Sequence, residues 1–285
     1  MSRKRSLDGA VRARRQESVR VEGRRGCFND VYLSLASDAR ANVVFFPGDV
    51  QHFDHVMRRG DFKAYSAFSY ESVCDHYARR FPDANVWVVK PFSHAKGVSC
   101  YDNFVDHVDG DPTQYAVDGP AFMHLQLLME RASALFPGDL TWSLPLHLHG
   151  FSRGAVVLNQ LITELGSLLH RPPSPTHVDA TWEDLADGSS ISAFFDRVES
   201  IEWIDGGCNA RGLAYPSHDT ALVLLNAFRH ISLRVLVTPY HYAHRPWYAA
   251  DLAQFQTECQ HVELTQHFMD DAPSLQNHFE VLFVH

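Results

Sequence analysis

The amino-acid sequence predicts an α/β domain whose central sheet is mostly parallel and carries helices on both faces. From about residue 29 onward, short β-branched and aromatic runs alternate with longer helical patterns. Two runs, residues 42–46 and 86–89, are hydrophobic without interruption, which is typical of strands buried on both faces. No linker divides the body, so we interpret residues 29–285 as a single domain.

The remaining elements follow in strand and helix order. Further strands are predicted from β-branched or apolar runs at residues 141–149, 198–204, 233–239 and 262–268. Helices are predicted from apolar spacing at residues 70–81, 121–136, 155–169, 219–230, 246–259 and 274–284. Turn residues mark several ends: Pro47-Gly48 closes the first strand, and the proline-rich stretch 171–175 stops the helix before it. Two irregular inserts, near residues 92–120 and 170–196, are candidates for a lid and an acyl pocket.

Charge separates the N-terminus from the rest of the chain. Of the formal net charge of −9, residues 1–25 contribute +6 and the other 260 residues contribute −15. We therefore expect residues 1–28 to be a basic, flexible arm. A body this acidic gives no electrostatic reason to bind nucleic acid, because phosphate neutralisation requires a basic face. The arm fits a solvated tail, a nuclear-type basic cluster at residues 3–5, or an arginine-rich mitochondrial presequence, although its three acids weaken the last interpretation.

Cysteine usage and hydropathy predict an intracellular protein without an integral membrane span. The five cysteines are an odd number and form no CxxC pair, so they indicate neither a disulfide framework nor a thiolate zinc cage. No apolar run approaches the roughly 18 residues of a membrane span, and no apolar segment follows the basic start as in a secretory signal.

The strongest chemical signal is Gly150-x-Ser152-x-Gly154. A serine nucleophile must sit on a sharp strand-to-helix turn, so that its hydroxyl projects above the sheet, and small residues must flank it. This is the sequence's only such match, and it lies between a predicted strand and an apolar helix. The context favours the nucleophile elbow of an α/β-hydrolase fold, with Ser152 as the nucleophile. The alternative is a purely structural glycine-serine-glycine turn.

A serine nucleophile requires a histidine base and an acid that orients it, and α/β-hydrolases place these in the chain order serine, acid, histidine. Asp205 directly follows the strand 198–204, where catalytic groups are expected, and two glycines follow it. His278 lies beyond the last strand, at the start of the last helix. The sequence leaves rivals for both roles: Asp219, Asp251, Asp270 and Asp271 for the acid, and His241, His244, His261, His267 and His285 for the base.

An oxyanion hole needs two backbone N–H groups, one from the residue after the nucleophile and one from the loop after an earlier strand. These predict Arg153 and Asp49, the second in the loop that follows the strand 42–46. The carboxylate of Asp49 would oppose an oxyanion unless it pointed away. The alternative role for Asp49 is a simple cap of the next helix.

Metal catalysis is the alternative chemistry, because the chain holds 18 histidines. However, there is no HExxH motif, and neither His147-x-His149 nor His241-x-x-His244 has a carboxylate at a zinc-hydrolase spacing. No GxxxxGK[ST] or GxGxxG motif occurs either, so no cofactor is predicted.

Five segments together resemble the chromosome 2 open reading frame 69 family, whose members are uncharacterised mitochondrial α/β-hydrolase-like proteins. The segments are FFPGDVQ (residues 45–51), GFSRGAVVLNQL (150–161), IEWIDGG (201–207), VTPY (237–240) and APSLQNHF (272–279). The resemblance implies the same serine, acid and histidine, at Ser152, Asp205 and His278, and a mitochondrial location. It names no reaction.

The sequence thus predicts a serine hydrolase that acts on a small substrate with an ester, thioester or related acyl bond. The alternative is a binding or scaffold protein that keeps the hydrolase fold without turnover.

Overall fold

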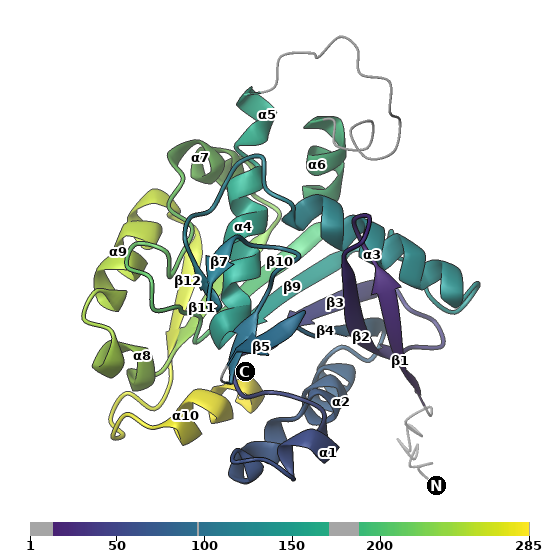
Figure 1. Cartoon of the computed structure of the whole chain (residues 1–285). Helices are drawn as coiled ribbons and strands as arrows, with labels where there is room; N and C mark the ends of the chain where they lie inside the picture. Colours follow the sequence, from purple (N-terminus) through teal and green to yellow (C-terminus); the bar gives the residue numbers. More distant parts are fainter. Residues whose placement is uncertain (1–13, 96, 171–187, 285) are drawn as a thin grey trace, which may run out of the picture.

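A computed structural model of the chain describes residues 14–95, 97–170 and 188–284. Within these ranges, eight strands form the central sheet, in the order β1-β2-β4-β3-β9-β10-β11-β12 (Figure 1). β2 is antiparallel to β1 and β4, and the strands from β4 to β12 are parallel to one another. This is the mostly parallel sheet of the predicted α/β-hydrolase fold.

The strands of the sheet are β1 (Arg15–Glu22), β2 (Phe28–Leu35), β3 (Ala41–Phe46), β4 (Ala84–Val89), β9 (Leu146–Phe151), β10 (Val198–Ile204), β11 (Ser232–Val237) and β12 (Val262–Gln266). The α-helices are α1 (Asp54–Met57), α2 (Tyr70–Arg80), α3 (Ala121–Leu135), α4 (Ala155–Glu164), α5 (Ser167–His170), α6 (Gly188–Phe195), α7 (Asp219–Ala227), α8 (Pro239–His244), α9 (Tyr248–Glu258) and α10 (Leu275–Glu280). Short 3₁₀ helices are η1 (Lys63–Phe68), η2 (Ser152–Gly154) and η3 (Val281–Phe283).

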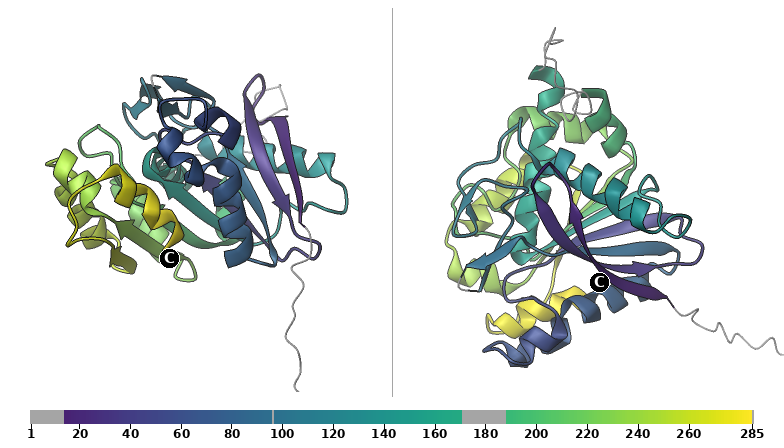
Figure 2. Two further views of the ribbon diagram at one scale, coloured as in Figure 1. Left: turned by 90° about the horizontal axis from the view of Figure 1, so that it is seen from below. Right: turned by 45° about the vertical axis from the view of Figure 1, so that its right-hand side comes forward.

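The two faces of the sheet carry separate hydrophobic cores, because successive side chains of a strand point to opposite faces. In β3, Val44 and Phe46 join the core under α3, α4, α7 and α9. Val43 and Phe45 join the other core, under α2 and α10. Figure 2 shows α10, in yellow, beside α1 and α2, in dark blue. The C-terminal helix is thereby held against the first part of the chain.

The expected flexible arm is wrong over its second half. Residues 15–22 form β1, which pairs with β2 at one edge of the sheet. Val21 is buried, whereas charged side chains such as Arg15 occupy exposed positions, an alternation typical of an edge strand. The high charge of this segment hides the pattern in the sequence. Residues 1–13 lie outside the described residues.

The insert near residues 92–120 forms two small hairpins, β5 (Ser93–Ala95) with β6 (Val98–Cys100) and β7 (His107–Val108) with β8 (Asp111–Pro112). Its aromatic side chains Tyr101 and Phe104 are buried in the core against Phe46. They pack the insert against the core, and its role as a lid or acyl pocket stays a prediction. Of the second insert, residues 171–187 lie outside the described residues, and Phe194 and Phe195 are core residues.

Most predicted elements are present, with differences in where they begin and in how the helices are divided. β9 starts at Leu146, after Pro145, which has no N–H to give to a sheet. The helix predicted at 155–169 is two helices, separated at Gly166, and α8 precedes the helix predicted at 246–259. Across the described residues, none of the helices combines the length and the apolar composition that crossing a membrane requires.

Candidate active site

Ser152 lies on a tight turn between β9 and α4. Its φ of +50° is in the left-handed region, which non-glycine residues rarely adopt and which costs about 1–3 kcal/mol. A Cβ on Gly154 would lie 1.9 Å from the carbonyl oxygen of Phe46, and one on Gly150 would lie 2.8 Å from the Cα of Ala155. The turn therefore requires both glycines, and it has the strained geometry of a nucleophile elbow.

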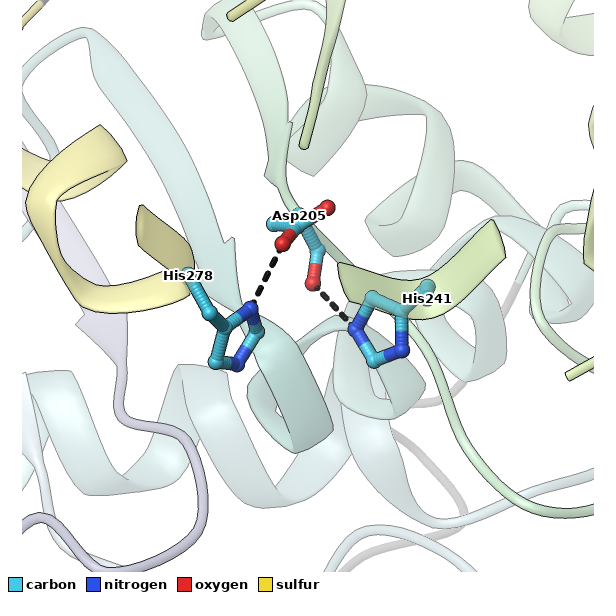
Figure 3. Close-up of side chains that lie close together, drawn as sticks. All are labelled: Asp205, His241 and His278. Carbon is cyan, nitrogen blue, oxygen red and sulfur yellow. Dashed lines mark hydrogen bonds and ion pairs between the residues drawn. The ribbon is translucent and has the colours of Figure 1, made fainter. Parts of the chain in front are cut away.

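Asp205 and His278 are brought together although they lie 73 residues apart in the chain. Asp205 follows β10, and His278 lies in α10, whose first turn is capped by the Ser274 side chain. The His278 Nδ1 is 2.6 Å from Oδ2 of Asp205, and both side chains are buried (Figure 3). Because a carboxylate oxygen accepts, Nδ1 carries the proton, which leaves the His278 Nε2 as the nitrogen that can take a proton from a nucleophile.

The carboxylate of Asp205 is held by further donors. Burial by itself raises the pKa of Asp205, but His241, His278 and Thr238 outweigh it and lower the pKa below its usual value. The Thr238 N–H donates to Oδ1 at 2.9 Å, and the Thr238 hydroxyl donates to Oδ2 at 2.5 Å. Asp205 is therefore ionised at neutral pH, as the orienting acid of a triad must be.

The imidazole ring of His278 lies between two aromatic rings beside the elbow. Its centroid is 4.7 Å from that of Phe151 and 4.6 Å from that of Tyr240. Phe151 directly precedes Ser152 in the chain. In addition, the Gly207 N–H donates to the carbonyl of Ser152 at 3.1 Å, which ties the loop after Asp205 to the elbow.

The loop after β3 lies directly against Ser152. A Cβ on Gly48 would lie 2.6 Å from the Cβ of Ser152, so only glycine allows this approach. The Gly48 N–H donates to the side chain of Gln51 at 2.8 Å, and the Val50 N–H donates to the carbonyl of Gly97 at 3.1 Å. Between them, the Asp49 N–H meets no acceptor among the described residues, and it stays the predicted oxyanion donor of this loop.

The first insert braces this loop. The Tyr101 hydroxyl donates to the carbonyl of Pro47 at 2.6 Å, and the Ser99 hydroxyl donates to that of Gly48 at 2.9 Å. The Ser99 N–H donates to the Asp49 carboxylate at 2.7 Å. Asp49 does not cap the next helix, since the N-cap of α1 is Phe53. That alternative is therefore wrong, and the carboxylate is drawn toward the insert.

The side chain of Arg153 is buried and ion-paired. Its guanidinium donates to Asp111, which lies in β8, and lies 3.5 Å from Oδ2 of Asp49. Burial lowers the pKa of Arg153, but these two carboxylates outweigh it and raise the pKa above its usual value. Two carboxylates thus neutralise the charge next to the candidate nucleophile, and the predicted role of Arg153 stays with its backbone N–H.

Several of the rival acids and bases have other partners or positions in the structure. Asp251 accepts from the N–H groups of Gly212 and Ala214, and Asp219 lies in the first turn of α7. Asp271 accepts from the Asn277 side chain. Among the histidines, His261 contacts Asn226 and His244 contacts the carbonyl of Tyr240, whereas His285 lies outside the described residues.

The histidines of the metal hypothesis are engaged as well. His147 bonds Ser200, and His149 contacts Tyr77 and lies 3.3 Å from Glu202, on the face of the sheet under α2. Within the described part of the chain, one group of ligand atoms lies within 4.8 Å: Asp205, His241 and His278. Both ring nitrogens of His241 already have protein partners, so a metal ion would have to displace one of them.

Sequence reasoning missed two contributors to this site, Thr238 and Tyr240. Both follow β11, which is paired in parallel with β10, so they end beside Asp205. The rule that the carboxyl ends of parallel strands converge could have found them. The sequence indicates His241 as a rival base or as part of a metal pair, whereas in the structure its Nε2 lies 2.8 Å from the backbone carbonyl of Asp205.

The fold and the elbow with its Asp–His pair define the chain as an α/β-hydrolase-fold protein. Carboxyl esterase 2 of the fungus Tuber melanosporum has a similar structure, with a TM-score of 0.51 at 11% identity over 98% of this chain and 83% of that one. At this identity the likeness shows the fold alone.

The chain belongs to the C2orf69 family, whose model matches residues 20–137 and 139–264. It is 30% identical to the mitochondrial protein C2orf69 homolog of Danio rerio, over 92% of this chain and 77% of the relative. The human mitochondrial protein C2orf69 is 27% identical, over 84% of this chain and 73% of the relative. The family predicted from the five segments is confirmed, and the names of these relatives confirm the mitochondrial location that it implies.

Proposed function

We propose that this protein is a serine hydrolase that cleaves an ester, thioester or related acyl bond through Ser152, His278 and Asp205. The observation that carries the proposal is the buried Asp205–His278 pair, whose imidazole packs on Phe151 directly beside the strained Ser152. A non-catalytic protein has no need for both a strained serine and a histidine oriented by a buried carboxylate in one place.

In this mechanism, the Ser152 hydroxyl attacks the acyl carbonyl while the His278 Nε2 takes its proton. The Asp205 carboxylate keeps Nδ1 protonated and stabilises the imidazolium that forms. The N–H groups of Asp49 and Arg153 receive the oxyanion. His278 then gives the proton to the leaving alcohol or thiol. Water next attacks the acyl carbon while His278 takes a proton from it, and His278 returns that proton to the Ser152 oxygen as the acid leaves.

The proposed substrate is a small acyl compound that is neutral or cationic. The body of the chain is strongly acidic, and the guanidinium of Arg153, the residue after Ser152, is neutralised by Asp49 and Asp111. A polyanionic substrate would therefore meet an unfavourable potential.

Hydrolysis of activated esters tests the proposal. Purified protein is given p-nitrophenyl acetate, p-nitrophenyl butyrate and an acyl thioester, in parallel with Ser152→Ala and His278→Ala. We expect turnover by the wild type and a loss of about 10³-fold or more in both variants. Turnover that survives Ser152→Ala but disappears with a chelator would replace this mechanism with metal catalysis. Absence of turnover with every ester would favour the binding-protein alternative.

A further inference from the structure

A second buried histidine, His241, lies next to His278 and contacts the candidate acid through its backbone. The Nε2 of His241 lies 2.8 Å from the backbone carbonyl oxygen of Asp205 (Figure 3). A carbonyl oxygen only accepts, so Nε2 must carry the proton. His241 lies in α8, and its ring is 5.1 Å from that of His278, nearly perpendicular to it. The turn at Asp205 is therefore held by one histidine at its side chain and by another at its backbone.

Arg245 fixes the protonation state of His241. Its guanidinium lies 2.5 Å from Nδ1 of His241, and since a guanidinium only donates, Nδ1 must accept. Both ring nitrogens then have defined roles, and the ring is neutral. Burial first, and then the neighbouring His278 and Arg245, lower the pKa of His241 to about 3, against the opposing effect of Asp205. The remaining ring neighbours are Tyr240 and Tyr248, which bring no charge at neutral pH.

A continuous path of polar contacts runs from this pair to the elbow. Arg245 also donates to the Asn209 side chain at 2.8 Å, and Asn209 donates to Asp111 through its backbone and side-chain nitrogens, at 2.7 and 3.0 Å. Asp111 is the partner of Arg153, the residue after Ser152. The path joins the loops that carry the candidate acid and the candidate nucleophile, through the hairpin of the first insert.

The turn at Asp205 needs such support because its backbone is strained. Its φ is +41°, a left-handed value in a residue that is not glycine. The Asp205 N–H donates to the carbonyl of Leu236 at 2.7 Å, and the Asp205 carbonyl oxygen accepts from His241. Both backbone polar groups of the strained residue are therefore held. A strained conformation persists only when the surroundings over-determine it.

We propose that His241, locked neutral by Arg245, is a positioning residue that holds the strained Asp205 turn so that its carboxylate meets His278. The inference rests on the proposed function, since it assigns His241 to the same site. His241 touches no reacting atom in this scheme, and it acts through Asp205.

The test compares His241→Phe, which keeps an aromatic ring without the donor, with His241→Gln, which keeps an amide donor and acceptor. His244→Phe is the matched control, because His244 is exposed on the same helix. Two quantities are measured: the second-order rate at which a fluorophosphonate labels Ser152, and the downfield proton NMR signal of the His278 Nδ1–H, which needs no turnover.

We expect His241→Phe to lower the labelling rate about 100-fold and to remove or broaden the Nδ1–H signal, since a displacement of about 1 Å has effects of this size. His241→Gln should recover most of both, and His244→Phe should leave both unchanged. A folded His241→Phe variant with wild-type labelling and an intact signal would overturn the inference.

If His241→Phe does not fold, Arg245→Met tests the same idea by removing the lock. Labelling should slow and the Nδ1–H signal should broaden; no change in either would overturn the inference. An unlabelled wild type would instead overturn the proposed function, and the Nδ1–H signal would still report whether His241 positions Asp205.

Discussion

Two strained residues, Ser152 and Asp205, mark the site at the scale of single residues. Both have positive φ without being glycine, at an energetic cost of about 1–3 kcal/mol each. Both lie at the carboxyl end of a parallel strand, and the Gly207 N–H ties one turn to the other. Strain of this kind is retained where the surrounding contacts hold it.

Replacement of the acid tests the orientation of that imidazole. In Asp205→Asn, an amide replaces one of the oxygens that accept from His278 and Thr238, and the negative charge is lost. We expect ester hydrolysis to fall about 10³- to 10⁴-fold, as for comparable triads, while circular dichroism still shows a folded protein. Near-wild-type hydrolysis by a folded variant would return Asp219 and Asp251 to consideration.

Close packing at the elbow makes Gly154 irreplaceable. In Gly154→Ala, the new methyl group would meet backbone atoms of Phe46 and Pro47, which cannot move aside cheaply. We expect a loss of at least about 2 kcal/mol in the free energy of unfolding, measured by urea denaturation. Gly60→Ala is the control, because the nearest atom to its Cβ is 3.7 Å away. Equal stability of the two variants would contradict the close approach.

The sequence predicts the three residues of the candidate triad better than the residues that contact and hold them. Ser152, Asp205 and His278 can be named from a motif, a chain order and positions after strands. The convergence of parallel strand ends can indicate that Thr238 and Tyr240 lie near the site. Their contacts, and those of His241, depend on the pairing of β10 with β11 and on the position of α8. Such contacts join segments that are far apart in sequence and leave no local pattern.

At the scale of elements, a buried ion network joins α2 to the sheet. Glu202 of β10 accepts from Arg80 of α2 at 2.8 Å and from Arg234 of β11 at 2.9 Å, and its side chain is only 3% exposed. This network lies on the face of the sheet that also carries α10. It therefore fixes the helix layer in which His278 lies.

Removal of the Glu202 charge should be costly. In Glu202→Gln, two arginines lose their buried counter-charge, so we expect a loss of about 3–5 kcal/mol in the free energy of unfolding. Glu263→Gln is a matched control, since Glu263 also faces Arg234 but is 68% exposed and 3.7 Å away. Its loss should stay below about 1 kcal/mol. Similar denaturation midpoints for the two variants would refute a stabilising role of the network.

The order and type of the elements are largely predictable, because uninterrupted apolar strands and amphipathic helices are strong local signals. The edge strand β1 is the element that the sequence does not predict. Its side chains are mostly polar or charged, and it forms because β2 offers a partner and Val21 reaches the core. Pairing with a neighbouring strand, and not local sequence preference, decides whether such a segment forms a strand.

At the scale of the whole molecule, buried neutral histidines predict sensitivity to acid. His124 accepts from the Arg24 N–H and contacts Asn29, and burial lowers its pKa to about 3. Its folded-state pKa thus lies below the unfolded value of about 6.5. The neutral form is favoured by folding, so the stability that it contributes is complete above pH 6.5 and is lost as the pH falls toward 3.

The free energy of unfolding should therefore decrease between pH 6.5 and pH 4, by about 3 kcal/mol from His124 alone. His241 and His52, with pKa values of about 3 and about 4, act in the same direction. Urea denaturation at a series of pH values measures the slope. His124→Gln should flatten it, whatever its effect on stability at pH 7; an unchanged slope would show that His124 does not titrate as described.

We propose that Ser152 is an activated nucleophile in an α/β-hydrolase site. The most direct test of this proposal is peptide mass spectrometry of the folded protein after treatment with a fluorophosphonate. The Ser152 oxygen would bond to phosphorus, fluoride would leave and His278 would take the proton. We expect one phosphonyl group on Ser152, absent from Ser152→Ala and strongly reduced in His278→Ala. A folded wild type that stays unlabelled, or an adduct on another residue, would contradict it.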